Sequence, residues 1–200
     1  MKTYLIITAS LDAKYGVRDY EHRKITYIDS ITQTLKVLPK DVIPIIVENN
    51  GPRSTPLDTL GCEVFYTNNN SLCFRHKGGN ELADIKDVLI HYDIKDEDLV
   101  VKLTGRYKML SDTFFKEITE DHDAYVKYFN VCTKEFMPGQ DCVLGLMALR
   151  ADHWKKFDYT YERSPEVEMA VYTATKCRAK SLINLDVLCC FADDHRTLHV

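Results

Sequence analysis

The chain has 200 residues and a mass of 23.1 kDa, which suits one domain with a substantial core. Its net charge of -4 and isoelectric point near 6.0 argue against a nucleic-acid partner, because neutralising phosphates normally requires a basic face. No apolar run approaches the roughly 20 residues that span a bilayer, so we expect no transmembrane segment and a cytoplasmic location.

The first half of the chain alternates apolar runs with helical patterns. The apolar runs predict strands over residues 3–9, 42–47, 62–66 and 98–104. Apolar residues at helical spacing predict one helix between Asp19 and Pro39, and a second helix that begins at Asn80. Helices that alternate with strands imply a largely parallel sheet with right-handed crossovers.

The second half is less regular. We expect a helix over 111–121, strands over 124–131 and 142–149, a helix from Ser164-Pro165, and a last apolar stretch over 182–191. The predicted fold class is therefore α/β, with one mostly parallel, twisted sheet flanked by helices. The chain is either a single domain over 1–200 or one domain of a longer polypeptide.

Polar residues mark the ends of the four predicted strands of the first half: Ser10, Glu48 to Asn50, Asn68 to Asn70, and Lys102 to Tyr107. In an open parallel sheet, ligands bind outside the carboxyl ends of the strands. Ordinary turn chemistry explains any one of these polar clusters. Four clusters on one rim favour a binding site.

Two segments favour a ligand that carries a diphosphate. Gly78-Gly79-Asn80 opens a helix beside Lys77, where exposed backbone N–H groups attract a phosphate. In Lys102-Leu103-Thr104-Gly105-Arg106-Tyr107, Arg106 would clamp a phosphate, Lys102 would add charge, and Gly105 would allow close backbone approach. The alternative is that Arg106 or Lys102 pairs with a carboxylate and pins a turn.

The order of these segments resembles small GT-A-type glycosyltransferases, of the kind encoded in bacterial polysaccharide loci and by some large DNA viruses. The resemblance rests on the KLTGRY motif at Lys102 to Tyr107, on EHRKITYIDSI in the first helix, and on the later FMPGQDCVLGLMALRADHW. It implies a GT-A-like fold in which residues 1–110 bind a nucleotide sugar and residues 111–200 bind the acceptor. It also implies transfer of a sugar from a UDP- or GDP-sugar to a hydroxyl group of a glycan or glycoconjugate.

The resemblance assigns a role to each polar segment of the rim. The predicted donor-binding residues are Ser10, Glu48, Asn68 and Asn70 at the nucleoside, and Lys77, Gly78, Asn80, Lys102, Thr104, Gly105 and Arg106 at the diphosphate. Cations there would stabilise the departing diphosphate, which gives Arg106 a catalytic role as well.

One departure concerns the metal. GT-A enzymes commonly carry an Asp-x-Asp at the end of the fourth strand, and this chain has Leu103-Thr104-Gly105-Arg106 there. The strings Asp96-Glu97-Asp98 and Asp121-His122-Asp123 both precede strands, at the wrong end of the sheet. Either the protein works without a metal, or Asp193, Asp194 or His195 helps to hold Mn²⁺ or Mg²⁺.

An inverting transferase also needs a carboxylate that takes the proton from the acceptor hydroxyl. Asp152 is the predicted base, and Asp141, Glu166 and Glu168 are alternatives. Two other functions stay open. A sugar-phosphate nucleotidyltransferase would need a Gly-rich, Arg-containing loop after the first strand, which Ser10 to Lys14 does not provide. A domain that binds nucleotide sugars without catalysis is the other alternative.

Overall fold

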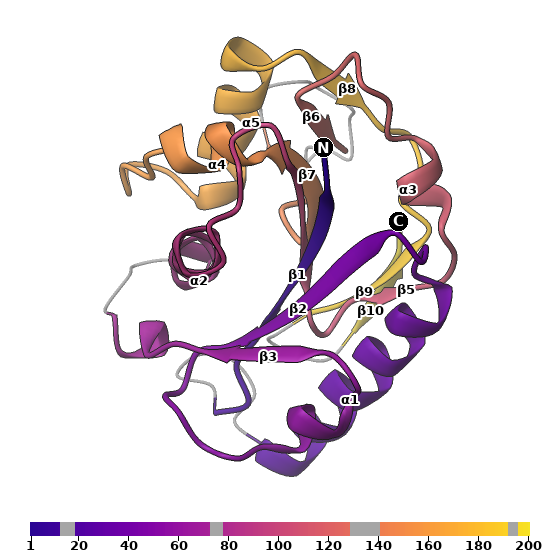
Figure 1. Cartoon of the computed structure of the whole chain (residues 1–200), viewed down its shortest axis with the longest axis vertical. Helices are drawn as coiled ribbons and strands as arrows, with labels where there is room; N and C mark the ends of the chain where they lie inside the picture. Colours follow the sequence, from indigo (N-terminus) through magenta and orange to yellow (C-terminus); the bar gives the residue numbers. More distant parts are fainter. Residues whose placement is uncertain (13–18, 73–77, 129–140, 192–195) are drawn as a thin grey trace.

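The computed structural model describes residues 1–12, 19–72, 78–128, 141–191 and 196–200 (Figure 1). Its centre is a seven-stranded sheet in the order β3-β2-β1-β4-β7-β6-β8. The first four strands are β1 (Thr3–Ala9), β2 (Val42–Glu48), β3 (Glu63–Tyr66) and β4 (Leu99–Thr104), and their pairings are all parallel. The predicted α/β fold with a mostly parallel sheet is confirmed.

The other half of the sheet contains the antiparallel exception. β7 (Leu146–Arg150) runs antiparallel to both β4 and β6 (Ala124–Val126), and β8 (Ala179–Ser181) pairs parallel with β6. A second, three-stranded sheet joins β5 (Lys108–Met109), β9 (Val187–Cys190) and β10 (Thr197–His199). β7 therefore begins at the edge where β4 ends.

Helices cover both faces of the sheet. α1 (Tyr20–Val37) lies on one side, and α2 (Gly78–His91), α4 (Ala151–Lys156) and α5 (Pro165–Lys176) lie on the other (Figure 1). The short elements are η1 (Pro56–Thr59), η2 (Asn69–Ser71) and α3 (Thr113–Lys116). In the described part of the chain, no helix combines the length and apolar character needed to cross a membrane.

This two-sided covering explains why the central strands are continuously apolar. Along β1, Tyr4 and Ile6 belong to the core under α2, whereas Leu5 and Ile7 belong to the core under α1. Successive side chains point to opposite faces of a strand, so each residue of β1 from Tyr4 to Ala9 is buried. The same reasoning applies to β4, which is buried at all its positions.

The predicted element boundaries differ most from those of the structure after residue 110. Only Thr113–Lys116 is helical within the predicted 111–121 helix, and the predicted strand over 142–149 begins at Leu146. Gly145 accounts for the second difference, because a Cβ atom there would lie 2.0 Å from the ring of Tyr107. The chain packs a turn against Tyr107 before β7 can start.

Candidate functional site

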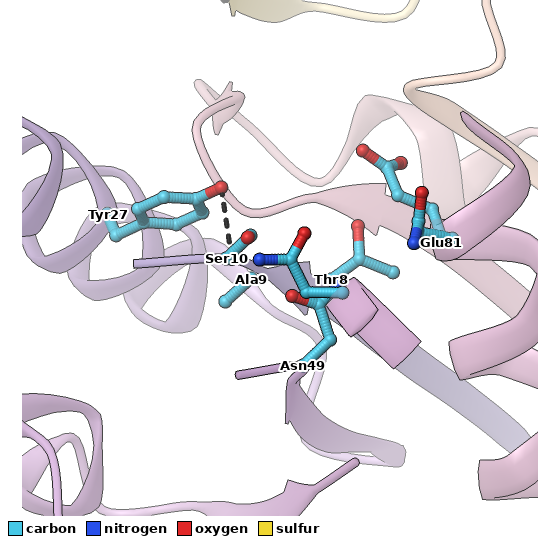
Figure 2. Close-up of a pocket in the computed structure, with 8 residues that line it drawn as sticks. Thr8, Ala9, Ser10, Tyr27, Asn49 and Glu81 are labelled. Carbon is cyan, nitrogen blue, oxygen red and sulfur yellow. Dashed lines mark hydrogen bonds between the residues drawn. The ribbon is translucent and has the colours of Figure 1, made fainter. Parts of the chain in front are cut away.

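The carboxyl ends of β1, β2 and β4 meet the first turn of α2, and two adjoining cavities open there. The smaller one is shown in Figure 2 and is lined by Thr8, Ala9, Ser10, Tyr27, Asn49 and Glu81, among others. Its volume of about 10 Å³ has room for one water molecule. The larger one has a volume of about 220 Å³ and is lined in part by Gly78, Glu81, Lys102, Thr104, Arg106 and Glu166. Glu81 lines both cavities, so the two adjoin at this residue.

Arg106 is the most informative residue of the larger cavity. Its side chain is largely buried, with only 6% of the residue exposed, and neither Nε nor Nη1 has a hydrogen-bond partner among the described residues. Burial alone would lower the pKa of this guanidinium, but Tyr27 and Glu81 raise the pKa above its ordinary value, so Arg106 stays charged. Burying a cation without a counter-ion costs several kcal/mol. The cavity therefore suits an anionic ligand.

The backbone around Arg106 is fixed from both sides of the rim. The N–H of Gly105 donates to Thr8 O at 2.8 Å, and Ser30 Oγ donates to the carbonyl of Arg106 at 3.1 Å. A Cβ atom at Gly105 would lie 2.9 Å from both Thr8 O and the ring of Tyr27. Packing against β1 and α1 thus already requires this glycine, which was predicted on a different ground, close approach to a ligand.

Lys102 also reaches the larger cavity, but its ammonium group is engaged inside the protein. Its Nζ lies 3.0 Å from Thr104 Oγ1, 2.9 Å from Leu144 O and 2.6 Å from Glu81 Oε2. An ammonium has three N–H groups, so these contacts use all of them. Thr104 Oγ1 donates to the same Glu81 oxygen at 2.9 Å. The geometry agrees with the alternative in which Lys102 pairs with a carboxylate, and we assign it no phosphate contact.

The glycine at the start of α2 also has a packing role. A Cβ atom at Gly78 would lie 2.5 Å from Pro165, so glycine lets the first turn of α5 approach α2. Asn80 lines the smaller cavity and donates through Nδ2 to the carbonyl of Asn69, which holds η2 against the helix. Lys77 and the predicted metal ligands Asp193, Asp194 and His195 lie outside the described residues.

The predicted nucleoside residues divide into two groups. Ser10 and Asn70 line the smaller cavity. Glu48 is fully buried, and its carboxylate accepts hydrogen bonds from the backbone N–H of Leu11 at 3.1 Å and of Asn50 at 3.0 Å. Burial raises the pKa of Glu48, and its role here is to order the loops. Asn68 opens η2 and does not line either cavity.

Asp152 lies at the opposite edge of the sheet. Because β7 is antiparallel to β4, its last residue, Arg150, pairs with Leu99 at the start of β4. The N–H of Asp152 donates to Asp96 O at 3.3 Å, and its carboxylate pairs with Lys156 at 2.8 Å. The structure therefore does not bring Asp152, the predicted base, to the cavities.

Of the alternative bases, Glu166 lines the larger cavity from the first turn of α5. Glu168 instead accepts hydrogen bonds from the N–H groups of Thr160 and Arg163, at 2.7 and 3.1 Å. Asp141 does not line the cavity. Glu166 is thus the carboxylate of the predicted set that the fold places beside Arg106.

Three residues at the site were given no role from the sequence: Asn49, which was noted only as part of the polar rim, Glu81 and Asp84. Asp84 is completely buried beside Asn49, and burial raises its pKa to about 7. Glu81 and Asp84 stand three residues apart, on the face of α2 that also carries the buried Leu82 and Ile85. Acidic residues on the face of a helix that is otherwise apolar were the signal available in the sequence.

The described residues of the larger cavity do not by themselves provide a set of ligands for a divalent cation. Among the described residues, Glu81 and Glu166 are the carboxylates that line the larger cavity, and Lys102 already neutralises Glu81. No group of three or more His, Cys, Asp or Glu side chains suited to a metal occurs in the described ranges. Hard cations such as Mg²⁺ and Mn²⁺ prefer several oxygen ligands. We therefore derive no step that uses a metal.

No family model matches the chain, and no curated protein matches it in sequence. Several solved structures match it in fold. One is a protein of Desulfovibrio desulfuricans G20, provisionally described as a nucleotide-diphospho-sugar transferase, with a TM-score of 0.55, 11% identity, and coverage of 91% of this chain and 80% of that one. Another is a CMP:2-keto-3-deoxy-manno-octonic acid synthetase complexed with CTP, with a TM-score of 0.53 and 13% identity. This match covers 91% of the present chain and 90% of the synthetase chain. A third is the galactosyltransferase LgtC in complex with donor and acceptor sugar analogues, with a TM-score of 0.53 and 9% identity. This match covers 90% of the present chain and 73% of the LgtC chain. The chain has the nucleotide-diphospho-sugar transferase fold.

Proposed function

We propose that the protein is a glycosyltransferase that moves a sugar from a nucleoside-diphosphate donor to a hydroxyl group of a glycan or glycoconjugate. The observation that carries the proposal is the buried guanidinium of Arg106, whose Nε and Nη1 have no partner in the described part of the chain. It lines a cavity at the carboxyl end of β4. A nucleoside diphosphate supplies the anion that this cavity requires, and the fold agrees with such a donor.

The two cavities suggest how the donor lies. The nucleoside would bind at the rim beside Ser10 and Asn70, and the diphosphate would bind at Arg106. As the bond between sugar and diphosphate breaks, negative charge grows on the leaving group. A fixed guanidinium stabilises that charge, and its planar fork matches two phosphate oxygens. Residues 1–110 then form the donor half, and residues 111–200 supply the acceptor side.

Glu166 takes the role first given to Asp152. Its position beside the cavity of Arg106 suits a carboxylate that accepts the proton of the acceptor hydroxyl while this oxygen attacks the sugar. This assignment implies an inverting reaction. A cytoplasmic location remains part of the proposal and rests on the sequence alone.

The decisive experiment is turnover with a panel of UDP-, GDP- and CDP-sugars, with glycan acceptors, in the presence and absence of Mn²⁺. We expect release of the nucleotide coupled to sugar transfer, with strong loss in Arg106→Ala. Arg178→Ala is the matched control, because Arg178 is exposed and pairs with Asp123 at the opposite edge of the sheet.

The alternatives give different outcomes in the same experiment. Release of pyrophosphate from CTP and a sugar phosphate, without turnover of any nucleotide sugar, would identify a nucleotidyltransferase. Binding of nucleotide sugars without turnover would identify a non-catalytic domain. If Arg106→Ala turned over as fast as the wild type, the site assignment would be overturned.

A further inference from the structure

A buried polar cluster lies next to the smaller cavity, where the ends of β2 and β3 meet α2. Asp84 is its centre. Its Oδ1 accepts hydrogen bonds from Thr67 Oγ1 at 2.7 Å and Asn69 Nδ2 at 2.9 Å, and its Oδ2 accepts one from Asn49 Nδ2 at 2.8 Å. No lysine, arginine or histidine within the described ranges pairs with this carboxylate. The described residues thus solvate this fully buried acid with three neutral donors.

The contact with Asp84 fixes the direction of the Asn49 amide. Asn49 is 3% exposed, it lines the smaller cavity beside Thr8 and Ser10 (Figure 2), and its Oδ1 has no hydrogen-bond partner among the described residues. Turning the amide over would set Oδ1 against the carboxylate oxygen of Asp84. Buried acceptors are normally satisfied. The cavity therefore offers an acceptor that requires a donor from a ligand or a water molecule.

We propose that Asp84 is a positioning residue that sets the hydrogen-bond character of Asn49. With the carboxylate ionised, Asn49 presents its Oδ1 acceptor to the cavity. A proton that binds Oδ2 of Asp84 turns this contact around: the new O–H donates to Asn49 Oδ1, and the Nδ2 group then faces the cavity as a donor. One proton is taken up, and no other bond forms or breaks.

The charged groups around Asp84 place this change near neutral pH. Burial raises the pKa of Asp84 to about 7, the hydrogen bonds from Thr67, Asn69 and Asn49 oppose the rise, and the charge of Glu81 adds to it. Asp87, on the same helix, faces the cluster through Asn69 at 2.8 Å. On β2, Glu48 precedes Asn49, but its carboxylate faces the loop that follows β1 and Arg53.

The consequence for ligands rests on the proposed function. The smaller cavity has room for one water molecule, so the edge of a base at its mouth would take the place of that water. Above the pH midpoint of the Asp84 titration, the site favours a base that donates a ring N–H, such as uracil or guanine. Below it, the site favours a base with a bare ring nitrogen, such as cytosine. UDP and CDP carry the same diphosphate, so protonation of the phosphate changes both affinities equally. The ratio of the two affinities therefore reports on the base alone.

The main test uses the nucleotide-free protein and the side-chain amide resonance of Asn49, assigned by its loss in Asn49→Ser. Between pH 5.5 and 8.5 we expect this resonance to titrate with a midpoint near 7. Asp84→Asn mimics the protonated acid, so the resonance should stay in its low-pH position throughout. Asp87→Asn is the matched control and should titrate like the wild type.

Thr67→Val provides a second variant if Asp84→Asn fails to fold. It removes one hydrogen bond to the ionised carboxylate and should move the midpoint up by roughly one pH unit or more. An Asn49 resonance that does not titrate in the wild type, or that still titrates in Asp84→Asn, overturns the proposal. As a second measurement, the affinity ratio of UDP to CDP should fall about 3- to 10-fold from pH 8 to pH 6, as expected for one hydrogen bond. If neither nucleotide binds, the proposed function fails, and the amide titration still decides the role of Asp84.

Discussion

Replacing Arg106 with alanine should weaken the binding of a nucleoside diphosphate and leave the protein folded. In the described part of the chain, Nε and Nη1 of this side chain hold nothing in place. Burial of a guanidinium with two nitrogens that no described residue satisfies also opposes folding. Little stability is therefore lost with the guanidinium, and the melting temperature of Arg106→Ala should stay close to that of the wild type or rise.

The loss of affinity follows from the number of bonds that the guanidinium makes. A hydrogen bond to a charged group contributes roughly 1.5–3 kcal/mol, so the loss of one predicts about 10- to 150-fold weaker binding. Two parallel bonds from Nε and Nη1 to phosphate oxygens would bring the effect to the upper end of this range. Arg106→Lys restores the charge without the planar fork and should recover only part of the affinity.

The assay is calorimetric titration with UDP and with GDP, run beside thermal melts of each variant. Arg178→Ala serves as the control for the loss of one positive charge, since its guanidinium lies far from the cavities, in an ion pair with Asp123. Its affinity for either nucleotide should equal that of the wild type.

The opposite pattern would refute the reasoning. An Arg106→Ala protein that melts several degrees earlier, yet binds UDP and GDP like the wild type, would make Arg106 a residue that pins the turn after β4. The main support for a nucleotide-sugar function would then be gone, and only the fold would remain.

Four further predictions test other parts of the structure. Lys102→Met should lower the free energy of unfolding by about 3–5 kcal/mol, because it removes the buried ammonium that neutralises the Glu81 carboxylate. Glu81→Leu in the same chain should recover much of this loss in chemical denaturation, and full additivity of the two losses would argue against the ion pair. Gly145→Ala should lower the free energy of unfolding by about 1–3 kcal/mol or more, since the new methyl group overlaps the Tyr107 ring. An unchanged denaturation midpoint would contradict this packing. The raised pKa of Asp84 means that the folded state binds its proton more tightly than the unfolded state, so its contribution to stability should fall by roughly 4 kcal/mol as pH rises from 3.8 to about 7; a stability gap to Asp84→Asn that is constant over this range would disprove it. Binding of UDP or GDP should survive EDTA with little loss, and a strict need for Mn²⁺ or Mg²⁺ in calorimetry would show that the metal ligands were misjudged.

The sequence was sufficient for the fold class because the first half repeats one simple unit. Each apolar strand is followed by a polar turn, and helical patterns with clear caps separate the strands. Asp19 caps α1 by accepting the N–H of His22, and Ser164 caps α5 by accepting the N–H of Val167. These signals are local, so they can be read without knowing what packs against them. The four strands predicted for the first half are neighbours in one parallel arrangement.

The direction of β7 depends on tertiary packing and could not be predicted from its own sequence. Its apolar sequence is the same whether it runs parallel or antiparallel to β4, since burial on both faces demands only apolar residues. The pairing of Arg150 with Leu99 sends Asp152 to one edge of the sheet and Gly145 to the other. The candidate base therefore changed from Asp152 to Glu166.

By itself, the sequence determined the parallel half of the sheet, the rim where its strands end, and the position of Arg106 on that rim. Only the tertiary structure decided what each polar group there touches. Lys102 pairs with Glu81, Asn49 donates to Asp84, and two nitrogens of Arg106 have no partner among the residues that the structure describes. The physical reason is that hydrophobic period and capping depend on residues a few positions apart, whereas the pairing of a buried charge depends on a group more than 20 residues away in the chain.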